Sequence, residues 1–134
     1  MPGARSRSAL AILLAAFYAS AGVLHLWSPE PFLLITPSWV PFPGTVILVT
    51  GLCEIAGAAG LLVPRLRASA GLMLGLYALC VLPANFKHAL YQIDVPGLPS
   101  SWWYHLPRLM FQPVLIWAAL YAGRVIDWPF RSGR

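Results

Sequence analysis

Long apolar segments alternate with short polar connections along most of the chain. The clearest segment, Thr45–Val63, contains Glu54 as its only charged residue. Its 19 residues would rise about 28 Å as a helix, close to the roughly 30 Å hydrocarbon core of a bilayer. Three other segments are comparably long and poor in charge. The pattern therefore predicts four transmembrane helices, at approximately residues 9–27, 45–63, 68–85 and 106–125.

The connections between these segments predict a single bundle. Pro64–Arg67 is so short that the second and third helices must form an antiparallel hairpin. The connection over residues 28–44 contains five prolines and the apolar run Phe32–Ile35, which predicts a short interfacial helix after Ser28. We therefore expect one all-α domain, a four-helix integral membrane bundle over residues 1–134.

The last long connection ends in aromatic residues. Trp102, Trp103 and Tyr104 precede His105 at the start of the fourth segment. Such aromatics are typical of the headgroup level of a membrane. They form either an interfacial belt or a lid over an outward-facing pocket.

The composition supports the membrane interpretation. Hydrophobic residues make up 59% of the chain and charged residues 10%, whereas soluble domains carry about 25% charged residues. A chain with so few charges cannot cover a water-facing surface. The net charge is +5, but the basic residues lie between apolar segments and lack the interleaved aromatics of a nucleic-acid site. We therefore expect a lipid bilayer as partner and no nucleic acid.

The positions of the basic residues predict the topology. If all four segments span, seven arginines lie on the side of both termini, and the charges on the opposite side cancel. The positive-inside rule then places both termini of a multi-pass plasma-membrane protein in the cytoplasm. The seven residues are Arg5, Arg7, Arg65, Arg67, Arg124, Arg131 and Arg134.

The first apolar segment has a second interpretation. Arg5, Arg7, an apolar stretch and the small residues Ala19–Ala21 resemble a cleaved signal peptide. The apolar stretch continues to Trp27, however. That length favours a retained transmembrane helix.

The two cysteines, Cys53 and Cys80, each lie inside an apolar segment. They form no C-x-x-C motif, so the sequence predicts neither a thioredoxin-like centre nor a metal site. Buried single cysteines are usually packing residues. The alternative is a pair that joins two helices.

Glu54 is the most informative position in the chain. An ionisable carboxyl at mid-membrane depth is costly, so such residues usually face a protein interior and serve a function. The carboxyl must pair with a positive group or become protonated. Arg108 is the best candidate partner, and His25 is the second. Either the carboxyl takes part in function, or it only clamps the bundle to Arg108.

Other polar residues inside the segments concentrate in their outer halves. Helical spacing places small residues beside most of them, as expected where membrane helices pack closely. The simplest arrangement is an outward-facing pocket with Glu54 as its floor, which binds a ligand or exchanges protons. Each residue also has a structural alternative, such as snorkelling toward the headgroups. The predicted pocket residues are His25, Glu54, Asn85, Arg108 and Gln112.

Several motifs, in order along residues 10–125, resemble the DoxX family. They are Gly22-x-x-His25, Pro37–Pro43, Gly51–Glu54, Gly60–Pro64 with Arg65 and Arg67, Pro83–Asn85, and Leu106–Arg108 with Gln112. The resemblance implies a small four-helix membrane protein whose five pocket residues form one site. The family name comes from a membrane subunit of a thiosulfate:quinone oxidoreductase, and other relatives are linked to redox defence complexes or to assembly of membrane proteins.

The first functional hypothesis is a redox-linked membrane subunit. A quinone or other small ligand would occupy the pocket, Glu54 would exchange a proton or anchor the ligand, and His25 would relay the proton outward. The chain has no haem, flavin, iron–sulfur or metal signature and no autonomous catalytic motif. We therefore expect at most an accessory subunit of a quinone-linked oxidoreductase, with no intrinsic cofactor except a bound quinone.

Two other classes of function remain open. The protein could be a non-enzymatic assembly partner of other membrane proteins, with Gly71-x-x-x-Gly75 as its close-contact face. The same motif is equally consistent with packing inside the chain or with a homodimer. A small-molecule transporter is less favoured, because the inner halves of the segments are apolar and no inverted repeat is visible.

Overall fold

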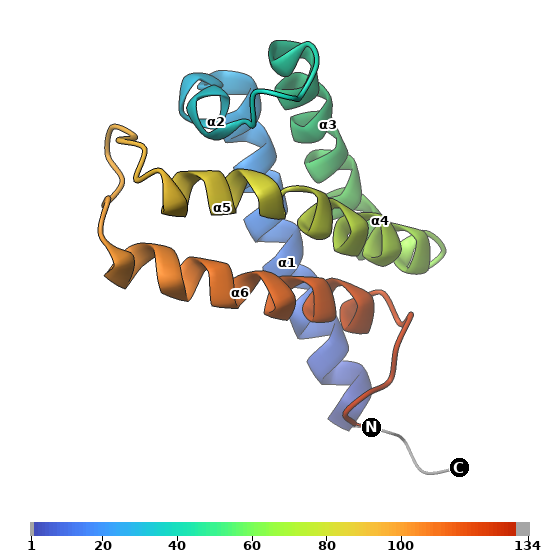
Figure 1. The fold of residues 1–134 in the computed structure, drawn as a ribbon. Helices are drawn as coiled ribbons and strands as arrows, with labels where there is room; N and C mark the ends of the chain where they lie inside the picture. The colour runs from blue at the N-terminus through green and yellow to red at the C-terminus, as the bar shows by residue number, and fades with distance from the viewer. Residues whose placement is uncertain (1, 131–134) are drawn as a thin grey trace.

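The computed structural model describes residues 2–130 as a set of packed helices (Figure 1). No strand occurs in that part of the chain. The prediction of an all-α protein is therefore confirmed. The helices are α1 (Pro2–Trp27), α2 (Glu30–Ile35), α3 (Pro43–Leu62), α4 (Arg67–Cys80), α5 (Leu82–Leu90) and α6 (Trp102–Ala122).

Three helical segments are long and apolar enough to cross a membrane: Gly3–Trp27, Pro43–Leu62 and Arg67–Leu90. They correspond to the first three predicted spans. The fourth, α6, has 21 residues and is long enough, but it does not belong to this set because Arg108 and Gln112 lower its hydropathy. The fourth span therefore stays a prediction.

α1 packs along α3, and two glycines allow the closest approach of these helices. A Cβ atom at Gly22 would lie 2.7 Å from the carbonyl oxygen of Gly51, and one at Gly51 would lie 2.7 Å from the Cβ atom of His25. Larger residues would force the helices apart. This packing places His25 of α1 beside Glu54 of α3.

α4 packs against α6 through a second pair of close approaches. A Cβ atom at Gly71 would lie 2.6 Å from the carbonyl oxygen of Ala119 and 2.6 Å from the Cα atom of Gly123, while one at Gly75 would meet Leu120 at 3.2 Å. The face Gly71-x-x-x-Gly75 is therefore used inside the chain. A role of this face in contacts with a partner or a second copy stays a prediction.

α4 and α5 follow each other with only Val81 between them. Pro83 has no N–H group and so removes one helical hydrogen bond at this point, but it is tolerated in the first turn of α5. α5 then continues to Leu90. The predicted end of this segment at residue 85 is therefore too early, and His88 lies in a helix rather than in a connection.

The short helix predicted after Ser28 is present as α2, which starts at Glu30. Its carboxyl end is tied to α5, because Lys87 Nζ donates a hydrogen bond to the carbonyl oxygen of Thr36 at 2.6 Å. Its aromatic residue Phe32 stacks on His25 of α1, with ring centroids 3.7 Å apart. α2 thus covers one end of the space between α1 and α5.

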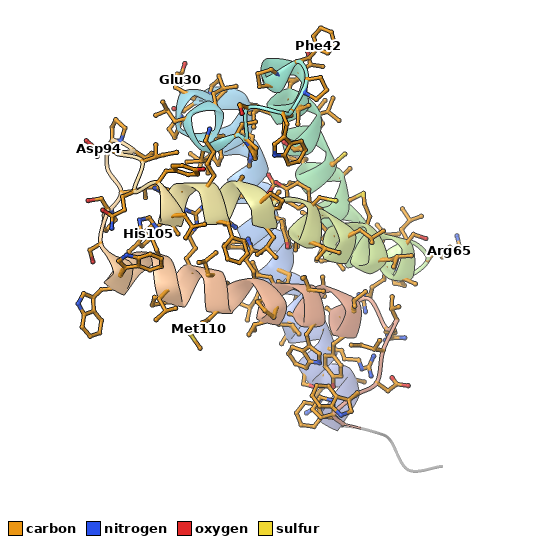
Figure 2. The ribbon with its side chains drawn as sticks, viewed as in Figure 1. Glu30, Phe42, Arg65, Asp94, His105 and Met110 are labelled. Atoms are coloured by element: carbon orange, nitrogen blue, oxygen red, sulfur yellow. The ribbon has the colours of Figure 1, made fainter. Side chains whose placement is uncertain are left out.

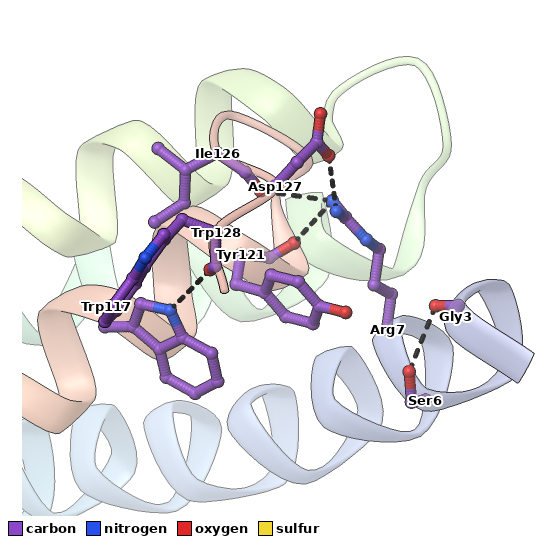
Figure 3. A network of polar contacts seen from close by, with 8 residues as sticks. All are labelled: Gly3, Ser6, Arg7, Trp117, Tyr121, Ile126, Asp127 and Trp128. Carbon is purple, nitrogen blue, oxygen red and sulfur yellow. Dashed lines mark hydrogen bonds and ion pairs between the residues drawn. The ribbon is translucent and has the colours of Figure 1, made fainter. Parts of the chain in front are cut away.

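The start of α1 and the segment after α6 meet at one end of the molecule (Figure 3). Arg7 Nη1 donates to the carbonyl oxygens of Tyr121 at 3.1 Å and Ile126 at 3.3 Å, and Nη2 lies 2.5 Å from Asp127 Oδ1. We call these four residues the Arg7 clasp. The clasp brings the two ends of the described chain together. Of the seven arginines in the topology prediction, Arg131 and Arg134 lie outside the described residues.

Candidate functional site

A cavity of about 710 Å³ lies between the α1–α3 pair and the helices α4, α5 and α6. Most of its lining is apolar, with a few polar side chains, which is the usual make-up of a small-molecule site. The five residues predicted for the pocket all line this one cavity: His25, Glu54, Asn85, Arg108 and Gln112. That they bind a ligand or exchange a proton stays a prediction.

Glu54 is almost fully buried, with 3% of its surface exposed. Its Oε2 atom lies 2.8 Å from His25 Nδ1. The same nitrogen lies 2.8 Å from the carbonyl oxygen of Ala21, one turn earlier in α1. His25 is therefore the neighbour of the Glu54 carboxyl, and both residues line the cavity.

The prediction of Arg108 as the best partner of Glu54 is wrong, and His25 takes that place. Arg108 Nη1 instead lies 2.6 Å from His88 Nδ1. A guanidinium only donates hydrogen bonds, so His88 Nδ1 accepts and its proton resides on Nε2. Arg108 therefore has a neutral neighbour, and its charge is not cancelled by Glu54.

Two buried histidines beside the cavity were missed as site residues. His88 and His105 are each 1% exposed, and their rings meet edge to face with centroids 4.6 Å apart. His105 lies between α5 and α6, whereas Met110 of the same helix points away from them (Figure 2). His88 follows Asn85 by three residues, a helical spacing that would have indicated a shared face had the helix been extended past residue 85.

Two buried polar atoms that belong to cavity-lining residues lack a hydrogen-bond partner: Tyr18 Oη and Gln112 Oε1. Each such atom costs about 1–3 kcal/mol of desolvation. Tyr18 lies on the same face of α1 as His25, two turns earlier, and its ring meets that of Tyr77 at 6.2 Å. The concentration of unpartnered atoms around one cavity is the feature to be explained, because buried polar groups are normally satisfied.

Cys53 and Cys80 are both free. Their pairing across two helices, left open by the sequence, is therefore not observed. In the part of the chain that the structure describes, no group of three or more His, Cys, Asp or Glu residues is arranged to hold a metal ion. Cys80 lines the cavity, whereas Cys53 does not.

Over residues 2–130, the fold defines a small helical protein with three segments able to cross a membrane and a ligand-sized cavity that these segments help to line. The chain belongs to the family described as Domain of unknown function (DUF8561), whose model matches residues 14–122. Comparison with curated proteins and with solved structures gave no match.

The family match overturns the resemblance to the DoxX family, because it assigns nearly the same part of the chain to a different family. The structure gives a physical reason for the error. Gly22 with His25, and Gly51 with Glu54, sit where α1 and α3 approach most closely. Small residues beside a polar one are a general requirement of close helix packing in membranes, so they do not identify a family.

Proposed function

We propose that this protein spans the plasma membrane with four helices, has both termini in the cytoplasm, and binds one lipid-soluble ligand in its cavity. The Arg7 clasp joins the start of α1 to the segment after α6. This contact supports a topology with both termini on the same side of the membrane. The cavity includes Trp39, in the connection between α2 and α3, and Tyr104, in the first turn of α6, both at the other end. This arrangement favours a cavity that faces the outer side.

The buried carboxyl of Glu54 beside the cavity carries the proposal. A carboxyl that is 3% exposed is expensive to keep in an apolar protein, and its neighbour His25 also lines the cavity. A bound molecule with a polar group beside this pair lowers that cost. The same molecule would fill a cavity of about 710 Å³, which is within the usual range for small-molecule sites.

The ligand class is a quinone. A quinone ring is apolar on its faces and carries oxygen atoms at two opposite edges, so it matches a cavity with apolar walls and separate polar groups. Arg108 donates to one edge, and Glu54 with His25 exchanges a proton at the other. The protein is then a redox-linked membrane subunit that presents the quinone, and a partner protein carries out the electron transfer.

Quenching of tryptophan fluorescence by decylbenzoquinone tests this function. Trp39 lines the cavity, whereas Trp103 does not and is 91% exposed. In lipid nanodiscs we expect saturable quenching with one site per chain. The signal should fall in Trp39→Phe and persist in Trp103→Phe. Quenching that rises linearly without saturation would count against a site.

Filling the cavity gives a second test. Ala84 lines the cavity and is only half-buried, so Ala84→Phe should occupy part of the ligand volume without replacing a core residue. Ala68 is exposed near the start of α4 and does not line the cavity. We expect Ala84→Phe to weaken binding at least about tenfold and Ala68→Phe to leave it unchanged. Equal binding in both variants would place the ligand elsewhere.

An assembly role is not favoured by the same observations. The glycine face that would have supported a partner packs on α6 of the same chain. A helix-contact function also leaves the unpartnered atoms of the cavity without an explanation.

A further inference from the structure

Arg108 brings a positive charge into the wall of the cavity. Its Nη1 atom lies 2.6 Å from Nδ1 of the neutral His88, and its guanidinium carbon lies 5.8 Å from the ring centroid of Tyr104. Glu54 is the one carboxylate among the lining residues, and it lies beside His25 instead. Within residues 2–130, no carboxylate therefore forms an ion pair with Arg108.

The surroundings of Arg108 favour a negatively charged ligand. The residue is half-buried, and most of the cavity lining is apolar. An opposite charge stabilises an ion more strongly in such surroundings than in water. A guanidinium carries five N–H donors, and the hydrogen bond to His88 uses one of them. The remaining donors can hold a carboxylate through two parallel hydrogen bonds.

Asn85 adds a second polar group beside Arg108. It lies on α5 one turn before His88, so it shares the helix face that the guanidinium contacts. In the described chain the side-chain hydrogen bonds of α5 involve Lys87 and His88. The Asn85 amide lines the cavity and, unlike Gln112 Oε1, is not sealed off without a partner. Its N–H groups are therefore free to donate to the oxygen that Arg108 holds.

The rest of the cavity wall suits an acyl chain. Apolar side chains from α3, α4 and α6 line it, among them Ile47, Ala78 and Leu115. A flexible chain adapts to such walls without polar partners, and each methylene group that it buries adds affinity. A molecule with one anionic head and one apolar chain matches both parts of the cavity.

We infer that the cavity binds a single-chain lipid acid, with its carboxylate on Arg108 and Asn85 and its acyl chain along the apolar wall. This inference goes beyond the proposed function, because a lipid acid is a different chemical class of ligand and needs no redox partner. It concerns binding alone and requires no chemical step. Since both ligands use Arg108 and the same cavity, the acid competes with a quinone.

Oleate and oleamide test the role of the charged head, because they share one chain and their heads have a similar shape. Their dissociation constants are measured by calorimetry on the protein in phosphatidylcholine nanodiscs, with empty nanodiscs as the partitioning control. The pH is alkaline, so that the acid is ionised. Hydrogen bonds to charged groups are the stronger class, so we expect oleate to bind at least about tenfold more tightly than oleamide. Equal affinities, or tighter binding of oleamide, would overturn the inference.

Three variants assign the preference to the residues involved. In Arg108→Gln the two ligands should bind within about threefold of each other, because the guanidinium is lost. Asn85→Ala should weaken oleate binding by about threefold, because one neutral donor is lost. Arg65→Gln is the matched control: it removes the same charge, but Arg65 is exposed and does not line the cavity, so the preference should persist. A preference that survives in Arg108→Gln, or that disappears equally in Arg65→Gln, would refute the site.

Two further measurements locate the ligand. Ala84→Phe fills part of the cavity and should weaken oleate binding at least about tenfold; unchanged binding would place the acid on the outer surface and refute the inference. Phosphatidylglycerol in the nanodiscs should leave the affinity within about threefold, measured against matching empty nanodiscs. A complete loss of binding would show that a lipid head group occupies Arg108 instead.

The outcomes distinguish this inference from the proposed function. If oleate binds and decylbenzoquinone does not, the proposed function fails and the lipid-acid site stands. If decylbenzoquinone binds and oleate does not, only the inference is refuted. If both bind, oleate should displace decylbenzoquinone, and independent binding would refute a shared cavity. The comparison of oleate with oleamide on the native protein decides the matter even if a variant fails to fold.

Discussion

Replacing Gly71 by alanine tests whether the close-contact glycines serve the fold of one chain or an association of chains. The new Cβ atom would lie 2.6 Å from both the Ala119 carbonyl oxygen and the Gly123 Cα atom. Both are backbone atoms, so no side chain can rotate away. An ordinary contact needs at least about 3.4 Å, so α4 and α6 must separate by several tenths of an ångström. Overpacking of this kind typically costs about 1–3 kcal/mol.

The assay is reversible unfolding in mixed detergent micelles, followed by circular dichroism. Gly44→Ala is the matched control, because Gly44 is also helical and a Cβ atom there would meet nothing within 4 Å. Alanine is the better helix former by about 0.5–1 kcal/mol, so we expect Gly44→Ala to be neutral or stabilising. A Gly71→Ala protein as stable as the native one, with an altered oligomeric state, would refute the assignment of this face to α6.

Three further changes have distinct expected results in the same unfolding assay. Glu54→Leu should abolish ligand binding. Because His25 Nδ1 keeps the carbonyl oxygen of Ala21 as a neighbour, the loss of stability without ligand should stay below about 3 kcal/mol; a larger loss would show that the Glu54 contact with His25 holds the fold. His88→Leu should destabilise by about 1.5–3 kcal/mol because Arg108 loses its acceptor, and an unchanged midpoint would show that this hydrogen bond is dispensable. Arg7→Ala should lower the free energy of unfolding by about 1–3 kcal/mol, because the half-buried guanidinium donates to two carbonyl oxygens. Asp127→Asn should lower it by less than about 1 kcal/mol, because Asp127 is 68% exposed. A larger loss of stability in Asp127→Asn than in Arg7→Ala would contradict the geometry of the Arg7 clasp.

The apolar segments were predictable because hydropathy and helical length are local properties. α1, α3 and the α4–α5 segment appear close to where the pattern placed them. The predicted end of the third segment at residue 85 was wrong. Pro83 lies in the first turn of α5, where proline costs little, so the helix continues to Leu90.

The partners of Glu54 and Arg108 were not predictable in the same way. Both His25 and Arg108 were compatible with Glu54 by depth and charge alone. The choice depends on how far the helices approach and rotate, which Gly22 and Gly51 decide for α1 and α3. Arg108 instead forms a hydrogen bond with His88. The predicted helix ended before His88, so this contact was not expected.

The sequence by itself determined an all-α chain of apolar segments with a buried carboxyl at Glu54, because the cost of burying a charge and the length of a membrane-spanning helix are encoded locally. The tertiary structure alone decided which groups that carboxyl meets. Contacts between side chains on different helices depend on crossing geometry, and shifts of about one ångström determine whether a hydrogen bond forms. In this protein they place Glu54 beside His25 and Arg108 beside His88, around one cavity.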